Sequence, residues 1–217
     1  MLKFYYAPLS VNARRVWIAL LEKQIPFEAI ALKLDGDQFQ PDFTAINPLQ
    51  RVPVLIDEDL RIVESFAILD YLETKFPTPA LMPTDAAAIA KIRMIQMVCI
   101  NELQPATIPL MKQMLQMEIP GDRVVAAQQR ITTTLQFLEA LTDNSPYFVG
   151  ENFTLADIVA GTLVPSVDMF GMPLTPYPNL HRLINQLAER PSWQTTAPSP
   201  ETIQAAIGNI KTILATR

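Results

Sequence analysis

Residues 52–72, VPVLIDEDLRIVESFAILDYL, place two strand patterns and a helix pattern in immediate succession. VPVLI and LRIVE are rich in aliphatic residues, and the acidic triplet at 57–59 between them predicts the tight turn of an antiparallel hairpin. SFAILDYLETKF follows with apolar residues at helical spacing, and Ser65 stands where a helix N-cap is expected. The stretch therefore predicts a ββα unit.

The residues before this unit add a strand, a helix and a second strand. LKFYY at 2–6 and PFEAIAL at 26–32 are strand-like, and RRVWIALLEKQ at 14–24 has the pattern of a helix. A strand, a helix and a strand at this distance form a parallel pair with a right-handed crossover. Because a polar stretch at 36–51 then leads into the hairpin, we expect one small mixed sheet with helices on both faces.

A proline-rich segment separates this sheet from the rest of the chain. FPTPALMPTD at 76–85 has three prolines, which stop a helix and keep a connection extended. Beyond it the chain reads as helix almost throughout, with a break where two prolines interrupt the first long helical stretch. We expect an α/β domain over 1–77, a linker over 78–85 and an all-helical domain over 86–217.

The composition excludes several classes of function. At 49% hydrophobic, 217 residues can bury a sizeable core, and a net charge of −5 disfavours non-specific binding to nucleic acid or anionic membrane. One cysteine, Cys99, and one histidine, His181, cannot form a structural zinc site or a disulfide, so we expect no metal. The glycines do not form a phosphate loop, and we expect a cytoplasmic protein because no signal peptide or membrane-spanning run is visible.

Pro53 interrupts a strand pattern, where a proline removes a backbone donor. If the Val52–Pro53 bond is cis, the N–H and C=O of Val52 are exposed and can pair with the peptide backbone of a ligand. The alternative is an edge-strand proline with no ligand. The tripeptide alone favours this alternative, because cis is the minority state of X–Pro bonds.

Glu64 and Ser65 join a strand to a helix. The unpaired N–H groups and dipole of a helix N-terminus attract anions, so a ligand carboxylate could dock on the hydroxyl and amide of Ser65. Glu64 beside it could hold an ammonium group, and together they would receive the head of an amino acid. The alternative is an ordinary capping serine after an exposed glutamate.

Ser10 precedes the helix that starts near Asn12. Its hydroxyl and the free amides of the helix start could stabilise a ligand thiolate, which lowers the pKa of the thiol without a protein base. The alternative is that Ser10 or Asn12 only caps the helix, with Arg14 and Arg15 as solvated charges.

In this order, the motifs resemble those of the cytosolic glutathione transferases. The matching pieces are APLSVNARRV at 7–16, NPLQRVPVLIDEDLRIVESFAILDYL at 47–72, FVGENFTLADIVAG at 148–161 and YPNLHRLINQLAERPSW at 177–193. The resemblance covers nearly the whole chain. It implies a thioredoxin-like domain in the order βαβ-α-ββα, an all-helical C-terminal domain, and a homodimer that binds glutathione in each subunit.

The resemblance also implies roles for single residues. The positions that match glutathione-binding residues are Gln38, Arg51, Val52, Pro53, Glu64 and Ser65. Pro53 would be the cis proline, and Val52 would pair through its backbone with the cysteinyl part of glutathione. Glu64 and Ser65 would hold the γ-glutamyl group. Gln38 and Arg51 lie at positions that often contact the glycyl carboxylate.

The thiol-activating residue implied by the resemblance is Ser10. The pattern S-x-x-x-R-x-V at 10–16 looks like that of the theta, phi and tau classes and their bacterial relatives. Other classes use a tyrosine at the end of the first strand, which makes Tyr5 or Tyr6 the alternative. The SSCS-type motif of the maleylacetoacetate isomerase branch is absent, which disfavours that branch, and no cysteine occupies the site.

The helical part of the chain offers less specific signals. Five methionines lie between positions 94 and 117, and most often such residues form core or dimer interface. Met111 and Met114 are the candidates for a hydrophobic substrate pocket, together with Leu9 beside Ser10. Asp157, three residues after Thr154, completes a capping-box pattern and is expected to act in folding.

The resulting prediction is a glutathione transferase that moves alkyl or aryl groups, as in detoxification. Glutathione would bind along the VPVL edge as co-substrate, and its thiolate would attack a small hydrophobic electrophile or reduce an organic hydroperoxide. Two alternatives remain. One is a non-catalytic binding or scaffold module of the same fold, and the other is a glutathione-dependent isomerase that does not consume glutathione.

Overall fold

The computed structural model describes residues 1–33 and 35–204 and divides them into two compact units. The first unit consists of residues 1–80 together with 191–204, and the second of residues 81–190. Each unit has its own set of fully buried aliphatic side chains, such as Leu55 in the first and Ile131 in the second. The two are described separately below.

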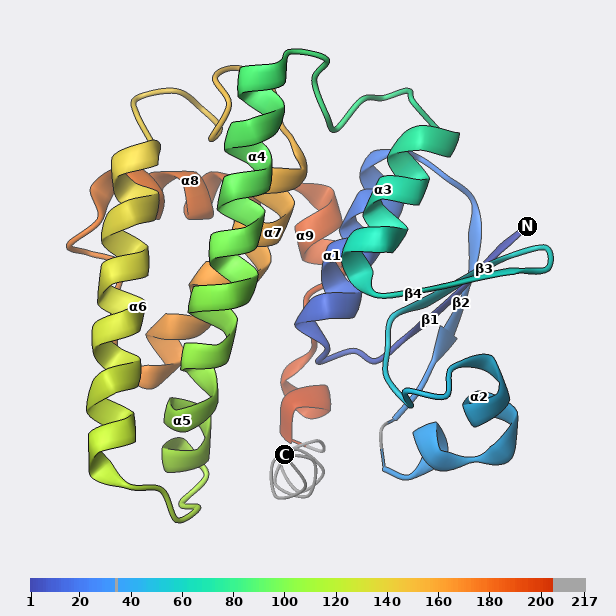
Figure 1. Cartoon of the computed structure of the whole chain (residues 1–217), viewed down its shortest axis with the longest axis horizontal. Helices are drawn as coiled ribbons and strands as arrows, with labels where there is room; N and C mark the ends of the chain where they lie inside the picture. The colour runs from blue at the N-terminus through green and yellow to red at the C-terminus, as the bar shows by residue number, and fades with distance from the viewer. Residues whose placement is uncertain (34, 205–217) are drawn as a thin grey trace. The chain divides into compact units, whose positions relative to one another are not determined.

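The first unit is built on a four-stranded mixed sheet in the order β2-β1-β3-β4. The strands are β1 (Leu2–Tyr6), β2 (Phe27–Ala31), β3 (Val54–Asp57) and β4 (Leu60–Val63). β1 and β2 are parallel, whereas β3 runs antiparallel to β1 and to β4 (Figure 1). This arrangement confirms both the predicted parallel pair and the predicted hairpin.

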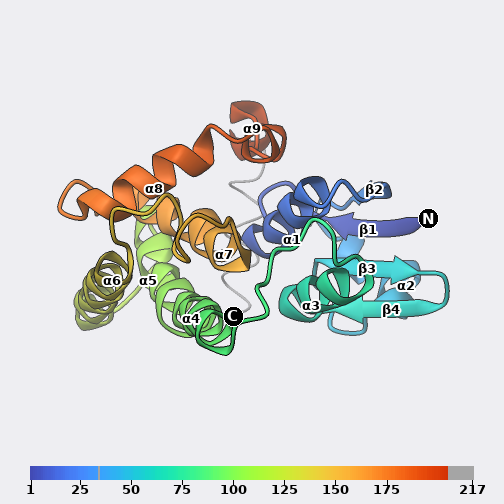
Figure 2. The ribbon, with the colours of Figure 1, turned by 90° about the horizontal axis from the view of Figure 1, so that it is seen from above.

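Helices cover both faces of this sheet, as predicted. They are α1 (Val11–Glu22), η1 (Asp37–Phe39), α2 (Pro41–Ile46) and α3 (Ser65–Lys75). The ring of Trp17 in α1 lies against Tyr6, with centroids 4.6 Å apart, whereas Tyr5 meets Phe43 of α2 at 5.9 Å. Because successive side chains of a strand point to opposite faces, β1 anchors a helix on each side of the sheet (Figure 2).

The two arginines of α1 are not solvated charges, so that part of the capping alternative is wrong. Arg15 is 0% exposed, and its guanidinium lies over the ring of Phe66 at 5.4 Å. Arg14 donates from Nη2 to the carbonyl of Trp193 at 3.2 Å and from Nε to Thr196 Oγ1 at 3.3 Å. Burial lowers the pKa of Arg14. Both side chains therefore act in packing.

These contacts of Arg14 attach α9 (Pro191–Thr195) to α1. Near the other end of α1, Glu22 accepts a hydrogen bond from Ser192 Oγ. Residues 191–204 therefore belong to the first unit, whereas the sequence analysis placed everything from 86 to 217 in the helical domain. The remainder of that predicted range, 205–217, lies outside the described residues.

The second unit is all-helical. Its helices are α4 (Ala86–Val98), η2 (Cys99–Leu103), α5 (Gln104–Met114), α6 (Gly121–Leu141), α7 (Leu155–Leu163), η3 (Val164–Phe170) and α8 (Pro178–Ala188). Every residue of α7 is buried, so this helix forms the centre of the unit. The break expected at Pro105 is a single π turn, η2, which joins α4 to α5.

Asp157 closes the predicted capping box at the start of α7. Its Oδ2 accepts from the backbone N–H of Thr154 at 2.8 Å, and its Oδ1 accepts from the N–H of Phe148 at 3.0 Å. Burial raises the pKa of this carboxyl to about 6, although the hydrogen bonds oppose the shift. The carboxyl thus ties the loop before α7 to the first turn of the helix.

None of the described helices is both long and apolar enough to cross a membrane. In the same part of the chain, no three His, Cys, Asp or Glu side chains gather as the ligands of a metal ion would.

Candidate functional site

The strand register brings the candidate residues to one end of the sheet in the first unit. Tyr6, the last residue of β1, pairs with Ala31, the last residue of β2. Tyr5 lies opposite Val54, where β3 begins, and Val54 also pairs with Val63, where β4 ends. The segments that carry the candidate residues therefore all enter or leave the sheet at this end.

Two helices also start at this end, α1 directly after Ser10 and α3 directly after Glu64. Neither helix has an acidic residue in its first turn. The partial positive charge of the two N-termini is therefore not offset within those turns, which suits an anionic ligand.

Ser10 is the N-cap of α1. Its Oγ accepts a hydrogen bond from the N–H of Ala13 at 3.2 Å, and its carbonyl accepts from the N–H of Arg14 at 2.8 Å. Among the described residues no acceptor takes the proton of its hydroxyl. Ser10 can therefore cap the helix and donate to an anion at the same time, so the two interpretations of this residue are compatible.

The alternative tyrosines are held by ring packing on opposite faces of the sheet. Tyr6 stacks on Phe4 at 5.5 Å and tilts against Trp17, while Tyr5 packs against Phe43. Both rings are half-buried. They contribute to the helical layers on each side of the sheet, whereas Ser10 sits in the loop that follows β1.

Val52 precedes a cis peptide bond to Pro53, as the resemblance implied. In the stretches that the structure describes, neither the N–H nor the C=O of Val52 is hydrogen-bonded. The turn before it is held by Asn47, whose Nδ2 donates to the carbonyl of Arg51 at 2.7 Å and whose Oδ1 accepts from Leu49 at 3.0 Å. The backbone of Val52 is thus available to a ligand.

Glu64 and Ser65 form the junction between β4 and α3. Glu64 is exposed and has φ 69° and ψ 122°, a conformation that costs a residue with a side chain about 1–3 kcal/mol. Ser65 is only 4% exposed, yet no described residue hydrogen-bonds to its hydroxyl. Strained backbone next to a hydroxyl without a partner in the described chain is typical of a binding site.

Gln38 and Arg51 lie between β2 and β3 in the chain. Gln38 is 5% exposed, sits in η1 after β2, and accepts from the N–H of Gly36 at 3.2 Å through Oε1. The side chain of Arg51 is exposed and makes no hydrogen bond or ion pair with another described residue.

Of the three residues predicted to line a hydrophobic pocket, the structure places one beside a hollow. In the second unit, a hollow of about 250 Å³ lies between the end of α5 and the end of η3. It is lined by Leu110, Gln113, Met114, Met169 and Phe170, and we call it the α5–η3 hollow. It includes Met114 but not Met111, and Leu9 belongs to the first unit.

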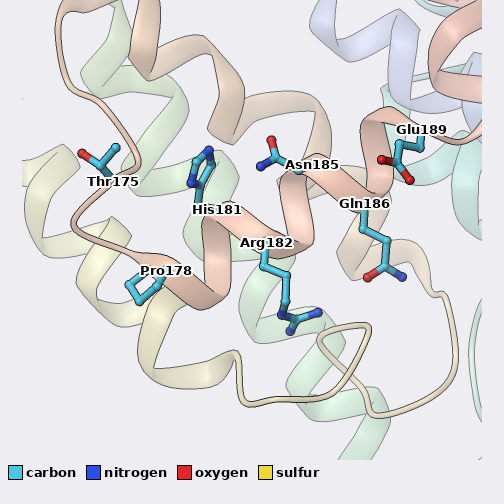
Figure 3. A pocket seen from close by; sticks show the side chains of 7 residues that line it. All are labelled: Thr175, Pro178, His181, Arg182, Asn185, Gln186 and Glu189. Carbon is cyan, nitrogen blue, oxygen red and sulfur yellow. The ribbon is translucent and has the colours of Figure 1, made fainter.

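A larger, open hollow of about 560 Å³ follows the polar face of α8. The side chains around it do not converge: Arg182 and Gln186 point to one side of the helix, and His181 and Asn185 to the other (Figure 3). Arg182 also donates hydrogen bonds from Nη2 to the carbonyls of Asp143 and Ser145. This arrangement offers no catalytic constellation.

Asn47 supports the candidate site, although its sequence position predicted no role for it. It is 2% exposed, and both ends of its amide hold the turn that presents Val52. The signal that could have found it is the Asn-Pro pair before the predicted strand, because asparagine side chains commonly organise such turns.

Comparison with known protein families gives two matches. Residues 4–80 match the model of the glutathione S-transferase N-terminal domain, and residues 98–191 match that of the glutathione S-transferase C-terminal domain. The order of the two domains agrees with the expected thioredoxin-like and all-helical domains.

Individual relatives are similar over most of their length. Glutathione S-transferase Z1 of Arabidopsis thaliana is 32% identical over 208 residues, which are 92% of this chain and 93% of the plant protein. Maleylacetoacetate isomerase of Rattus norvegicus is 32% identical over 85% of this chain and 86% of its own. The crystal structure of maleylacetoacetate isomerase from Methylobacterium extorquens AM1, with bound malonate and glutathione, has a TM-score of 0.77 and 30% identity, covering 92% of this chain and 98% of that one.

Proposed function

This chain belongs to the glutathione S-transferase family of enzymes, and from that premise we propose that it is a glutathione-dependent isomerase of a maleyl-type cis double bond. The supporting observation is its similarity to the two maleylacetoacetate isomerases, one of which binds glutathione together with a dicarboxylate. This proposal replaces conjugation, the main expectation from the sequence, with one of its alternatives. The SSCS motif remains absent, so the proposal rests on the similarity over the whole chain and not on that motif.

Glutathione fits the polar groups at the end of the sheet. The free N–H and C=O of Val52 suit a peptide backbone, which the cysteinyl part of glutathione provides. The hydroxyl of Ser65, which has no partner among the described residues, and the start of α3 suit the γ-glutamyl carboxylate, and Glu64 suits its ammonium group. We assign the glycyl carboxylate to Gln38 and Arg51.

The chain contributes anion stabilisation and positioning. Bound glutathione supplies a thiolate that can add to a conjugated double bond and leave it again. The hydroxyl of Ser10 donates a hydrogen bond to that anion while its Oγ accepts one from the N–H of Ala13. The partial positive charge at the start of α1 stabilises the anion further. The turn held by Asn47 sets the position of Val52 and thereby of the bound tripeptide.

Product analysis tests this proposal. We would supply maleylpyruvate or maleylacetone with a small fraction of one equivalent of glutathione, follow both isomers by proton NMR, and titrate free thiol. We expect many turnovers to the trans isomer with no loss of thiol. Stoichiometric loss of thiol, or no trans product, would rule the isomerase out.

Conjugation is the second candidate, and the α5–η3 hollow favours it. The lining of this hollow is apolar apart from the amide of Gln113, so it suits an uncharged hydrophobic electrophile better than a dicarboxylate. An aryl halide or cumene hydroperoxide assayed with excess glutathione would detect this activity as thioether or disulfide formation.

We further propose a homodimer, which is the common assembly of the family. A dimer would sediment at twice the 24.3 kDa of the chain. The cytoplasmic location expected from the sequence stays a prediction.

A further inference from the structure

The kink between α4 and α5 leaves a backbone carbonyl that the helix itself cannot satisfy. In a continuous α-helix the C=O of Asn101 would accept from the N–H four residues later, but that residue is Pro105, which has none. The N–H of Gln104 bonds instead to the carbonyl of Cys99, five residues back, which closes the π turn. The carbonyl of Asn101 is therefore left without its α-helical donor.

Arg130 of α6 supplies that donor. Its Nη2 donates to the carbonyl of Asn101 at 2.6 Å, and its Nε donates to Glu102 Oε2 at 2.6 Å. The pair with Glu102 is about half exposed, so by itself it stabilises little. The bond to the carbonyl is exposed as well, but it occupies an acceptor whose helical donor the proline has removed.

α5 depends on such outside support. A second proline, Pro109, removes the N–H that would bond the carbonyl of Pro105, so the helix loses two ladder bonds within two turns. The far end of α5 carries Leu110 and Met114, which form one wall of the α5–η3 hollow. The direction in which α5 leaves the π turn therefore sets the width of this hollow.

We propose that Arg130 is a positioning residue that fixes α5 at the π turn and thereby shapes the α5–η3 hollow for the apolar part of a substrate. Its effect on turnover rests on the proposed glutathione-dependent function. The effect of Arg130 on the position of α5 is independent of that function, because it follows from the missing N–H of Pro105 alone.

A double-mutant cycle between Arg130→Ala and Pro105→Ala tests the first step. Pro105→Ala restores an N–H to the chain, so it should make the arginine dispensable. We expect Arg130→Ala to speed hydrogen exchange of the amides at 106–112 by at least about fivefold in the natural sequence, and by less than about twofold in the Pro105→Ala background. Equal effects in both backgrounds would overturn the proposal.

Three further variants separate the carbonyl bond from the ion pair. Glu102→Gln, which keeps the carbonyl bond, should leave exchange at 106–112 unchanged, and a fivefold rise would overturn the proposal. Arg123→Ala, two turns earlier on the exposed face of α6, is the matched control and should change nothing. Arg130→Lys, which keeps one donor, should give an intermediate effect and replaces Arg130→Ala should that variant not fold.

Kinetics with glutathione and an aryl halide, 1-chloro-2,4-dinitrobenzene, test the second step. We expect Arg130→Ala to raise KM for the halide about fivefold with kcat within about twofold, because binding in the hollow is lost and thiolate formation is not. A fall in kcat of about fivefold with KM for the halide unchanged would overturn the proposal that Arg130 shapes the α5–η3 hollow. Should even the natural protein fail to conjugate the halide, conjugation fails as the second candidate function, and the exchange cycle still decides the role of Arg130.

Discussion

Single residues at the end of the sheet depart from what folding alone favours. The hydroxyl of Ser65 has no hydrogen-bond partner among the described residues. Glu64 beside it holds a backbone conformation that costs stability, and the backbone of Val52 is unpaired in the same part of the chain. These departures lie together at one end of the sheet, which is why we assign the ligand there.

Replacing Glu64 with glycine separates folding from binding. Glycine accepts a positive φ without strain, so Glu64→Gly should raise the free energy of unfolding by up to about 1 kcal/mol. The loss of the carboxylate should weaken glutathione binding by about tenfold in calorimetry. Glu58→Gly, at φ 54° in the turn between β3 and β4, is the matched control: it should gain similar stability with unchanged affinity. Unchanged glutathione affinity in Glu64→Gly would remove this residue from the site.

Asp157→Asn tests the structural role of the capping carboxyl. An amide cannot accept from both backbone donors, Thr154 and Phe148, so one buried N–H loses its partner. Urea unfolding at pH 5 should show a loss of about 1–3 kcal/mol, with turnover of the folded protein within about twofold of the natural enzyme. Lost turnover with unchanged stability would assign Asp157 to the chemistry.

The same variant reports the pKa of Asp157. Since this pKa is raised from 3.8 to about 6 on folding, the native state binds the extra proton between these values. The contribution of Asp157 to stability is therefore complete below about pH 4 and is lost as pH rises through 6, by up to about 3 kcal/mol. The stability difference between natural protein and Asp157→Asn should shrink from pH 4 to pH 7. A difference that grows over this range would mean that the hydrogen bonds outweigh burial.

At the scale of helices and strands, the spacing of apolar residues and the residues typical of turns and caps predicted most of the elements. The hairpin after Pro53, the βαβ unit and the capping box at Thr154 all follow from local patterns, because alternation and capping depend on neighbours in sequence. The roles of Arg14 and Arg15 could not be predicted, since a basic residue near a helix start looks solvated until its tertiary partners are known. Likewise, Pro105 predicts a break in the helix. It does not predict that the break takes the form of a π turn, or that Arg130 donates to the carbonyl there.

The attachment of α9 to α1 is testable through Arg14. Arg14→Ala removes two hydrogen bonds from a buried guanidinium, so it should lower the free energy of unfolding by about 1–3 kcal/mol and speed amide exchange at 192–196. Thr196→Val removes only one of the two contacts and should show a smaller effect of the same kind. If Arg14→Ala leaves exchange at 192–196 unchanged, α9 is held by the Ser192–Glu22 hydrogen bond and its apolar contacts without Arg14.

At the scale of the whole molecule, the family and fold were readable from the sequence, and the reaction was not. Three motifs in one order sufficed for the family because they encode a shared glutathione geometry. The choice between conjugation and isomerisation depends on the second substrate, and the hollow proposed for it is lined by generic apolar residues such as Met114 and Leu110. The return of the chain to the first unit after residue 190 could not be predicted either, because α9 joins that unit only through tertiary contacts.

The most direct test of the central claim is the pH dependence of thiolate absorbance for glutathione bound to the natural protein, to Ser10→Ala, and to Tyr5→Phe and Tyr6→Phe. We predict a thiol pKa at least about one unit below the free value of about 8.5 in the natural protein and in both tyrosine variants, with return toward that value in Ser10→Ala. A depressed pKa that survives Ser10→Ala, or is lost only in a tyrosine variant, would contradict the account.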